Sequence, residues 1–256
     1  MTAFLVAGCA VFGLLVGSFL NVVIWRVPRR ESIVHPRSHC PNCGNQLRSI
    51  DNIPVVSWLA LRGKCHFCAN PISARYPLVE LLTGALFAAV AARFGADWAL
   101  PAFLVWVAGL VVLSAIDLDH QLLPIRVVYP TLAGLAVLLV GAAALTGRWD
   151  DLARAGAGGA LGFVLLFLVH FAVPKGMAFG DVRLSGLNGV ALGWLGVGYV
   201  LVGLFLAFLT SSVIGLALIA AKVRSRKDRI PFGPFLAAGA VLAVFAGGPI
   251  LRWYGL

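Results

Sequence analysis

The chain has 256 residues, of which 61% are hydrophobic and 12% are charged, and its mean hydropathy is +0.95. Soluble globular domains carry about 25% charged residues, so this composition argues against a soluble protein and indicates one that lies largely in lipid. The formal charge of +10 does not indicate a nucleic-acid-binding protein, because no nucleic-acid-binding signature accompanies it and basic loops of membrane proteins contact anionic lipid headgroups.

Eight apolar segments follow one another along the chain, and most are long enough to cross about 30 Å of hydrocarbon as a helix. The first has no basic region in front of it, so we interpret it as a retained helix and not as a cleaved signal peptide. The sixth is short, and a glycine-rich turn at 193–198 must separate it from the seventh. The sequence therefore predicts an all-α polytopic membrane protein with about eight transmembrane helices. The segments are 3–25, 77–95, 99–116, 127–146, 156–173, 184–197, 199–221 and 232–250.

The basic residues predict the orientation of these helices. The polar loop 26–76 contains eight Lys and Arg residues, and cytoplasmic loops of membrane proteins are enriched in such residues. If this loop is cytoplasmic, alternation through eight spans places sixteen Lys and Arg on its side and four on the other. We therefore expect three parts: a first transmembrane helix (1–25), a cytoplasmic loop domain (26–76) and a transmembrane domain (77–256). Asp117 and Asp181 then both fall at the cytoplasmic ends of their helices.

Two Cys-x-x-Cys pairs lie in the loop, and their four thiols are Cys40, Cys43, Cys65 and Cys68. Each pair offers two thiolates to one metal ion, and two pairs complete the tetrahedral sulfur set of a structural zinc site. Disulfides are the competing interpretation, but a cytoplasmic loop would keep its thiols reduced. Redox use or another metal is a further alternative. The loop has few apolar residues, so we expect bound zinc to supply its folding energy.

Acidic residues are scarce, and Asp117 and Asp181 stand out among the ten. Neither a Ser-His-Asp arrangement nor a His-Glu-x-x-His helix accompanies them. An acid at membrane depth is costly to desolvate, so it is a functional-site candidate. Two close carboxylates keep one proton between them and suit acid–base hydrolysis of a peptide. The alternative is that each acid only forms an ion pair with a nearby base, such as Arg126 or Arg183.

Several residues near these acids are candidate supporting groups. Asp119 is two residues from Asp117 and should face another direction on a helix. Gly180 permits a close backbone approach beside Asp181, and Pro124 should separate the third span from the fourth. Two further residues are candidates for substrate binding: Glu80, for which an ion pair with Arg75 is the alternative, and Lys175, for which anchoring at the lipid headgroups is the alternative.

These motifs together resemble those of the type IV prepilin peptidases, which are membrane aspartyl proteases of the Gly-x-Gly-Asp class. The likeness covers nearly the whole chain. Its motifs are Gly17-Ser-Phe-Leu-Asn-Val-Val-Ile24, the paired Cys-x-x-Cys loop, Asp51-Asn-Ile-Pro-Val-Val-Ser-Trp58, Leu61-Arg-Gly-Lys-Cys65, Arg75-Tyr-Pro-Leu-Val-Glu-Leu-Leu-Thr-Gly84, Asp117-Leu-Asp119 and Pro231-Phe-Gly-Pro234.

The resemblance implies that Asp117 and Asp181 are the catalytic pair. It also implies cleavage of prepilin or pseudopilin precursors at the cytoplasmic face of a bacterial inner membrane, after the glycine that ends a short leader. Many members then methylate the new amino terminus with S-adenosylmethionine, and no methyl-donor pocket is evident in this sequence. Two positions depart from the family pattern: Ala178 replaces the first glycine of Gly-x-Gly-Asp, and Ile125 replaces an acid. We expect Ala178 to preserve activity, because alanine in place of glycine is harmful only where the backbone angles disfavour it.

Two other classes of function compete with the enzyme. A proton-coupled carrier would also use intramembrane acids, but carriers bind near the membrane midplane and show internal repeats, and no repeat is evident here. A zinc-bearing membrane scaffold without chemistry would tolerate the loss of either aspartate. The leading prediction is an aspartyl endopeptidase.

Overall fold

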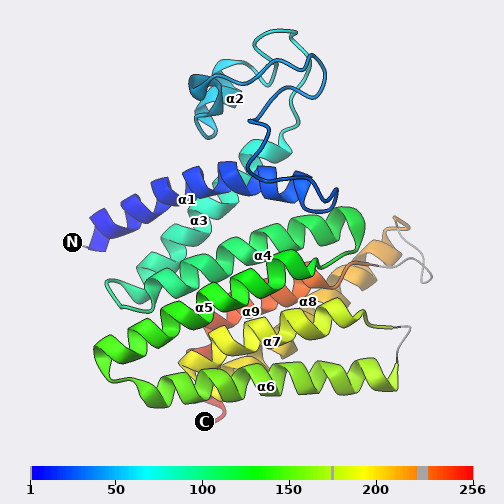
Figure 1. Cartoon of the computed structure of the whole chain (residues 1–256). Helices are drawn as coiled ribbons and strands as arrows, with labels where there is room; N and C mark the ends of the chain where they lie inside the picture. The colour runs from blue at the N-terminus through cyan, green and yellow to red at the C-terminus, as the bar shows by residue number, and fades with distance from the viewer. Residues whose placement is uncertain (1, 174–175, 224–229, 256) are drawn as a thin grey trace. The chain divides into compact units, whose positions relative to one another are not determined.

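The structure is a computed structural model that describes residues 2–173, 176–223 and 230–255. Over these residues, nearly all regular structure is α-helical, and β-pairing is limited to two isolated bridges in the polar loop. Figure 1 shows the helices in chain order. They are α1 (Thr2–Arg26), η1 (Ser49–Asn52), α2 (Val56–Ala60), α3 (Arg75–Phe94), α4 (Leu100–His120), α5 (Ile125–Thr146), α6 (Trp149–Ala172), α7 (Phe179–Leu195), α8 (Val197–Ala220) and α9 (Gly233–Trp253).

Each of the eight predicted apolar segments coincides with a long helix, which confirms the predicted fold class. Seven of these helices are long and apolar enough to cross a membrane: α1, α3, α4, α5, α6, α8 and α9. The remaining helix, α7, has 17 residues and begins at Phe179, five residues before the start expected from hydropathy. The difference arises because its first turn contains the polar residue Asp181, which an apolar window excludes.

The break between α7 and α8 falls at Gly196, inside the glycine-rich turn that the sequence predicted. Its backbone angles are φ 145° and ψ 146°, a conformation that residues with a side chain rarely adopt. The amide N–H of Gly196 donates to the carbonyl oxygens of Leu192 and Gly193, which closes the end of α7. One long apolar run is thereby divided into two separate helices.

The chain divides into two compact units, and the first is Met1–Leu100. In this unit α1 packs against α3, and the Asn21 side-chain amide donates to the carbonyl oxygen of Tyr76 across the pair. The polar loop joins the two helices and contains η1 and α2. Arg26, at the end of α1, is buried and donates to the carbonyl oxygens of Ser32 and Pro36, so the start of the loop is held by a satisfied buried charge.

The second unit is Pro101–Leu256 and contains most of α4 and all of α5 to α9. Within it, α6 packs along α7 and α8 packs along α9, as Figure 1 shows. The α6–α7 pair is close because Gly158 and Gly189 face each other, and a methyl group on either would meet the backbone of the other. Small residues permit such close helix packing in lipid. Of the candidate spans, α4 is the most deeply buried, and its side chains Phe103, Trp106 and Ile116 have no exposed surface.

Candidate active site and metal centre

The four predicted cysteines of the first unit converge on one point. Their Sγ atoms all lie within 4.8 Å of one another, and the Sγ atoms of Cys40 and Cys68 are 3.9 Å apart. Zinc–sulfur bonds of about 2.3 Å in a tetrahedron place neighbouring sulfur atoms about 3.8 Å apart. The donor set and its spacing therefore fit one tetrahedral zinc ion held by Cys40, Cys43, Cys65 and Cys68.

The two pairs of cysteines form turns of the same construction. In the first, the N–H of Cys40 donates to Asn45 O and the N–H of Gly44 donates to Cys40 O. In the second, the N–H of Cys65 donates to Asn70 O and the N–H of Ala69 donates to Cys65 O. The repeated construction brings four thiols together from two separate stretches of the loop.

Gly44 and Ala69 occupy the same place in the two turns, and both have left-handed backbone angles, with φ of 70° and 56°. Glycine adopts this conformation without strain, whereas alanine adopts it at a cost of roughly 1–2 kcal/mol. The second turn is therefore strained at Ala69 and the first turn is not.

Backbone amides favour the thiolate form of two of these cysteines. The N–H groups of Cys43 and Asn42 are directed at the sulfur of Cys40 and lower the pKa of that thiol. The N–H of Asn70 has the same effect on Cys68 and lowers the pKa of its thiol to about 7. The thiolate is the form that binds metal, so the turns prepare these side chains for an ion.

Asp117 lies near the end of α4 and is buried, with 5% of its surface exposed. Its Oδ2 atom accepts a hydrogen bond of 2.9 Å from the backbone N–H of Gly233, the first residue of α9. The first N–H groups of a helix have no partner inside the helix and carry its positive end. Asp117 thus satisfies the start of α9, and α9 in return stabilises the carboxylate.

Asp181 lies in the first turn of α7 and is buried to a similar degree, with 6% of its surface exposed. Its Oδ2 atom accepts a hydrogen bond of 3.2 Å from the backbone N–H of Ala178, the residue before the helix. A carboxylate in this position caps the helix start and interacts favourably with its dipole. The local sequence therefore turns Asp181 inward at the place where the chain enters the helix.

The two carboxylates come close enough to interact electrostatically, although 64 residues separate them in the sequence. An ion pair with a nearby base is not needed to explain why each acid is buried. Each carboxylate accepts a hydrogen bond from a backbone N–H group. A pair of buried, interacting carboxylates from two helices is an arrangement that can exchange a proton with a bound water and a peptide carbonyl.

Three of the residues predicted to support the two acids are Asp119, Pro124 and Ala178. Asp119 is exposed whereas Asp117 is buried, so the two acids face different directions as the helical spacing predicted. Pro124 has extended backbone angles and separates α4 from α5. Ala178 has φ of −78° and ψ of 148°, an ordinary extended conformation, and its side chain is exposed. The backbone at position 178 therefore does not require glycine.

Gly180 and Gly233 allow close approach around the two acids. A Cβ atom on Gly180 would lie 3.0 Å from the Cβ of Leu123, which belongs to the turn after Asp117. A Cβ atom on Gly233 would lie 2.7 Å from Oδ2 of Asp117. No role was predicted for Leu123 or Gly233 from the sequence. The signal that could have found Gly233 is the motif Pro231-Phe-Gly-Pro234, where a glycine opens a helix between two prolines.

The two candidate substrate-binding residues have different outcomes. Glu80 is buried in α3, accepts a hydrogen bond of 2.8 Å from the N–H of Val55 and is hydrogen-bonded to Ser18. These contacts tie the polar loop to α1 and α3, and they give Glu80 a structural role. Substrate binding by Glu80 stays a prediction. Lys175 lies outside the described residues.

Comparison with known proteins decides the family of this chain. The Bacterial Peptidase A24 N-terminal domain matches residues 11–94, and the Type IV leader peptidase family matches residues 102–220, so the two matches follow the two compact units. The Prepilin leader peptidase/N-methyltransferase of Aeromonas hydrophila is 38% identical, and the alignment covers 95% of this chain and 91% of that protein. The chain belongs to the type IV leader peptidase family.

Two further leader peptidases agree with this membership. Proteins named Prepilin leader peptidase/N-methyltransferase from Stutzerimonas stutzeri and Pseudomonas aeruginosa are 39% and 37% identical to this peptidase. The alignments cover 96% and 94% of this chain, and 92% and 90% of the relatives. No solved structure matches. The family confirms the predicted enzyme, a membrane-embedded peptidase, over a carrier or a silent scaffold.

Proposed function

We propose that this peptidase removes the leader peptide of type IV prepilins or pseudopilins, and that Asp117 and Asp181 are its catalytic pair. The observation that carries the assignment is the pair of buried carboxylates from α4 and α7 that interact electrostatically. The substrate class is supported by the names of the relatives, which are prepilin leader peptidases. No other pair of acids in the described residues of the second unit is buried.

The proposed chemistry follows from two carboxylates sharing one proton. The ionised carboxylate removes a proton from a water molecule as the water oxygen attacks the peptide carbonyl carbon. The neutral carboxyl group donates its proton to the carbonyl oxygen, which gives a neutral tetrahedral intermediate. When the carbon–nitrogen bond breaks, the nitrogen takes the proton that the first carboxylate removed from water and leaves as the new amino terminus. One hydroxyl of the intermediate gives its proton to the other carboxylate, so the pair again holds one proton. The N–H groups of Gly233 and Ala178 hold the two carboxylates in place through these steps.

We further propose that cleavage takes place at the cytoplasmic face of a bacterial inner membrane. The excess of Lys and Arg in the loop 26–76 supports this orientation, because basic loops are retained on the cytoplasmic side. In this arrangement the loop is a zinc-stabilised cytoplasmic domain. Zinc held by the four cysteines would supply folding energy to the loop.

The relatives are also named as N-methyltransferases. In this peptidase, such an activity would transfer a methyl group from S-adenosylmethionine to the new amino terminus. This second activity is supported by those names alone, and we assign no residue of this chain to it.

The experiment that tests the peptidase is cleavage of a tagged prepilin in membranes that carry the wild type, Asp117→Asn, Asp181→Asn or Asp119→Asn. The exposed Asp119 is the matched control, because it lies on the same helix as Asp117 and carries the same charge. Loss of the cleaved product in the first two variants, at membrane levels equal to the wild type, supports the catalytic pair. Normal cleavage by either of those two variants would overturn it.

A further inference from the structure

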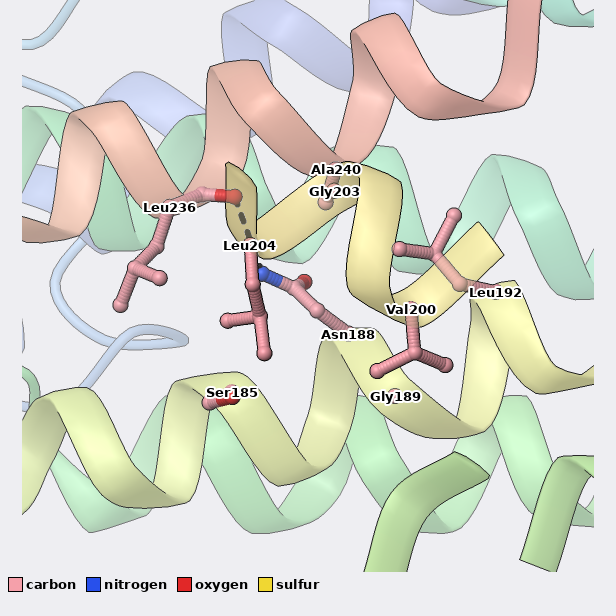
Figure 2. Close-up of a pocket in the computed structure, with 9 residues that line it drawn as sticks. All are labelled: Ser185, Asn188, Gly189, Leu192, Val200, Gly203, Leu204, Leu236 and Ala240. Carbon is pink, nitrogen blue, oxygen red and sulfur yellow. Dashed lines mark hydrogen bonds between the residues drawn. The ribbon is translucent and has the colours of Figure 1, made fainter. Parts of the chain in front are cut away.

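A buried hydrogen-bonded link joins the three helices α4, α7 and α9. The indole N–H of Trp106 on α4 donates to Oδ1 of Asn188 on α7, at 3.0 Å. The side-chain amide of Asn188 donates in turn to the carbonyl oxygen of Leu236 on α9, at 3.2 Å. Figure 2 shows the Asn188 side chain reaching across to this carbonyl group. All three residues are buried.

The three linked helices are the ones that carry the proposed site. Asp117 is on α4, Asp181 is on α7, and the N–H group that holds Asp117 comes from Gly233 on α9. Trp106 precedes Asp117 by eleven residues, and Asn188 follows Asp181 by seven. With about 100° per residue, either spacing returns to within about 20° of the same helix face. The link therefore lies on the faces that carry the two acids, about 10 Å along α7 from Asp181.

The residues around Asn188 are mostly small or aliphatic. Only a small hollow of about 10 Å³ lies beside Asn188, between α7, α8 and α9, and its walls include Leu192, Gly203 and Leu204 (Figure 2). Hydrophobic contacts between such side chains are not directional, so they constrain the register of neighbouring helices less than directed bonds do. The Asn188 amide accepts a directed hydrogen bond from α4 and donates one to α9. These bonds fix the register of the helices in a region that contains few competing polar groups.

We infer that Asn188 is a positioning residue for hydrolysis: by linking α4 and α9 to α7 it sets the separation of the two carboxylates. Asn188 does not touch the reacting atoms. The inference rests on the proposed function, because it takes Asp117 and Asp181 as the catalytic pair.

The test compares Asn188→Leu, Trp106→Phe and the double variant with the wild type. Ser185→Ala is the matched control. Ser185 is also buried in α7 and is closer to Asp181 in sequence, but its hydroxyl donates to the carbonyl oxygen of Gly162 on α6 and so makes no link to α4 or α9. The purified full chain is reconstituted in lipid, and prepilin cleavage is followed in a single turnover with enzyme in saturating excess. That rate constant does not depend on what fraction of the enzyme is folded.

The rate constant of Asn188→Leu is expected to fall by about tenfold or more, because a displacement of about 1 Å between reacting groups lowers rates by up to about 100-fold. The apparent affinity for prepilin should stay within about twofold, since the substrate surface is unchanged. The rate constant of Trp106→Phe should fall less than that of Asn188→Leu. The double variant should lose little more than Asn188→Leu alone, because the two residues act through one link.

The outcomes separate this inference from the proposed function. If Asp117→Asn or Asp181→Asn cleaves normally, the proposed function fails and this inference fails with it. If those variants are inactive and Asn188→Leu retains the wild-type single-turnover rate constant, only the positioning role is overturned. An equal loss in Ser185→Ala would also overturn it, because that result would show a general sensitivity of α7 to any lost hydrogen bond.

Discussion

The hydrogen bond between Gly233 and Asp117 offers the sharpest test of the proposed site, through the substitution Gly233→Ala. A Cβ atom at this position would lie 2.7 Å from Oδ2 and 3.2 Å from Cγ of Asp117. Ordinary contacts of a Cβ atom begin at about 3.4 Å, so the carboxylate would have to retreat by about 0.7 Å. The neighbouring Leu123 leaves little room on its own side, since its Cδ2 atom would be 3.2 Å from the new methyl group.

The consequences can be estimated from this displacement. The retreat is oblique to the hydrogen bond, so about 0.7 Å would stretch the N–H···Oδ2 distance from 2.9 Å to roughly 3.4 Å, beyond the usual range of such bonds. Hydrogen bonds to charged groups contribute about 1.5–3 kcal/mol, and each 1.4 kcal/mol corresponds to a tenfold change in rate. We therefore expect the turnover rate for prepilin cleavage to fall by about 10- to 100-fold.

The assay is the initial rate of prepilin cleavage at saturating substrate, with equal amounts of enzyme reconstituted in lipid. Gly215→Ala is the matched control, because Gly215 is also a buried helical glycine but its Cβ atom would make only an ordinary contact of 3.7 Å with Ile230. The control should keep a rate within about twofold of the wild type. Wild-type turnover in Gly233→Ala would refute the reasoning, as would an equal loss in the control.

Three further predictions concern the metal centre and the departure at position 178. Cys40→Ser should remove about one zinc ion per chain, measured by metal analysis, and expose the loop to trypsin, whereas Cys9→Ser should do neither, because Cys9 lies outside the cysteine cluster. Ala69→Gly should slow the loss of zinc to a chelator by about fivefold, because relieving a left-handed alanine gains about 1 kcal/mol, and Gly44→Ala should accelerate it. Ala178→Gly should cleave prepilin within about twofold of the wild-type rate, and a much higher turnover would show that the methyl group hinders the site.

Patterns that depend on neighbouring residues were predictable from the sequence. The hydropathy runs located all eight long helices of the described residues, since a membrane span must be apolar over its whole length. The two Cys-x-x-Cys pairs predicted the cysteine cluster, because each pair supplies two ligands from one short turn. The start of α7 was the weakest boundary. A hydropathy average is lowered by Asp181, although this acid lies in the first turn of the helix and caps its start.

Contacts between distant helices were not predictable in the same way. The bond from Gly233 to Asp117 spans 116 residues, and the bond from Trp106 to Asn188 spans 82. Hydropathy shows which residues enter the membrane but not which faces of the helices meet. Glu80 illustrates the same limit, because its buried carboxylate could be recognised from sequence as unusual while its partner, the N–H of Val55, belongs to the polar loop.

Three positions around the acids explain why we expect the departure at position 178 to be tolerated. A methyl group at position 180 would press on Leu123, and one at position 233 would press on Asp117 itself. At position 178 the backbone is extended with φ of −78°, and the side chain points to open surface. The N–H group that Ala178 donates to Asp181 is a backbone group, which alanine supplies as well as glycine does. The alanine thus stands at the one of these three positions where a side chain displaces neither acid nor the turn beside them.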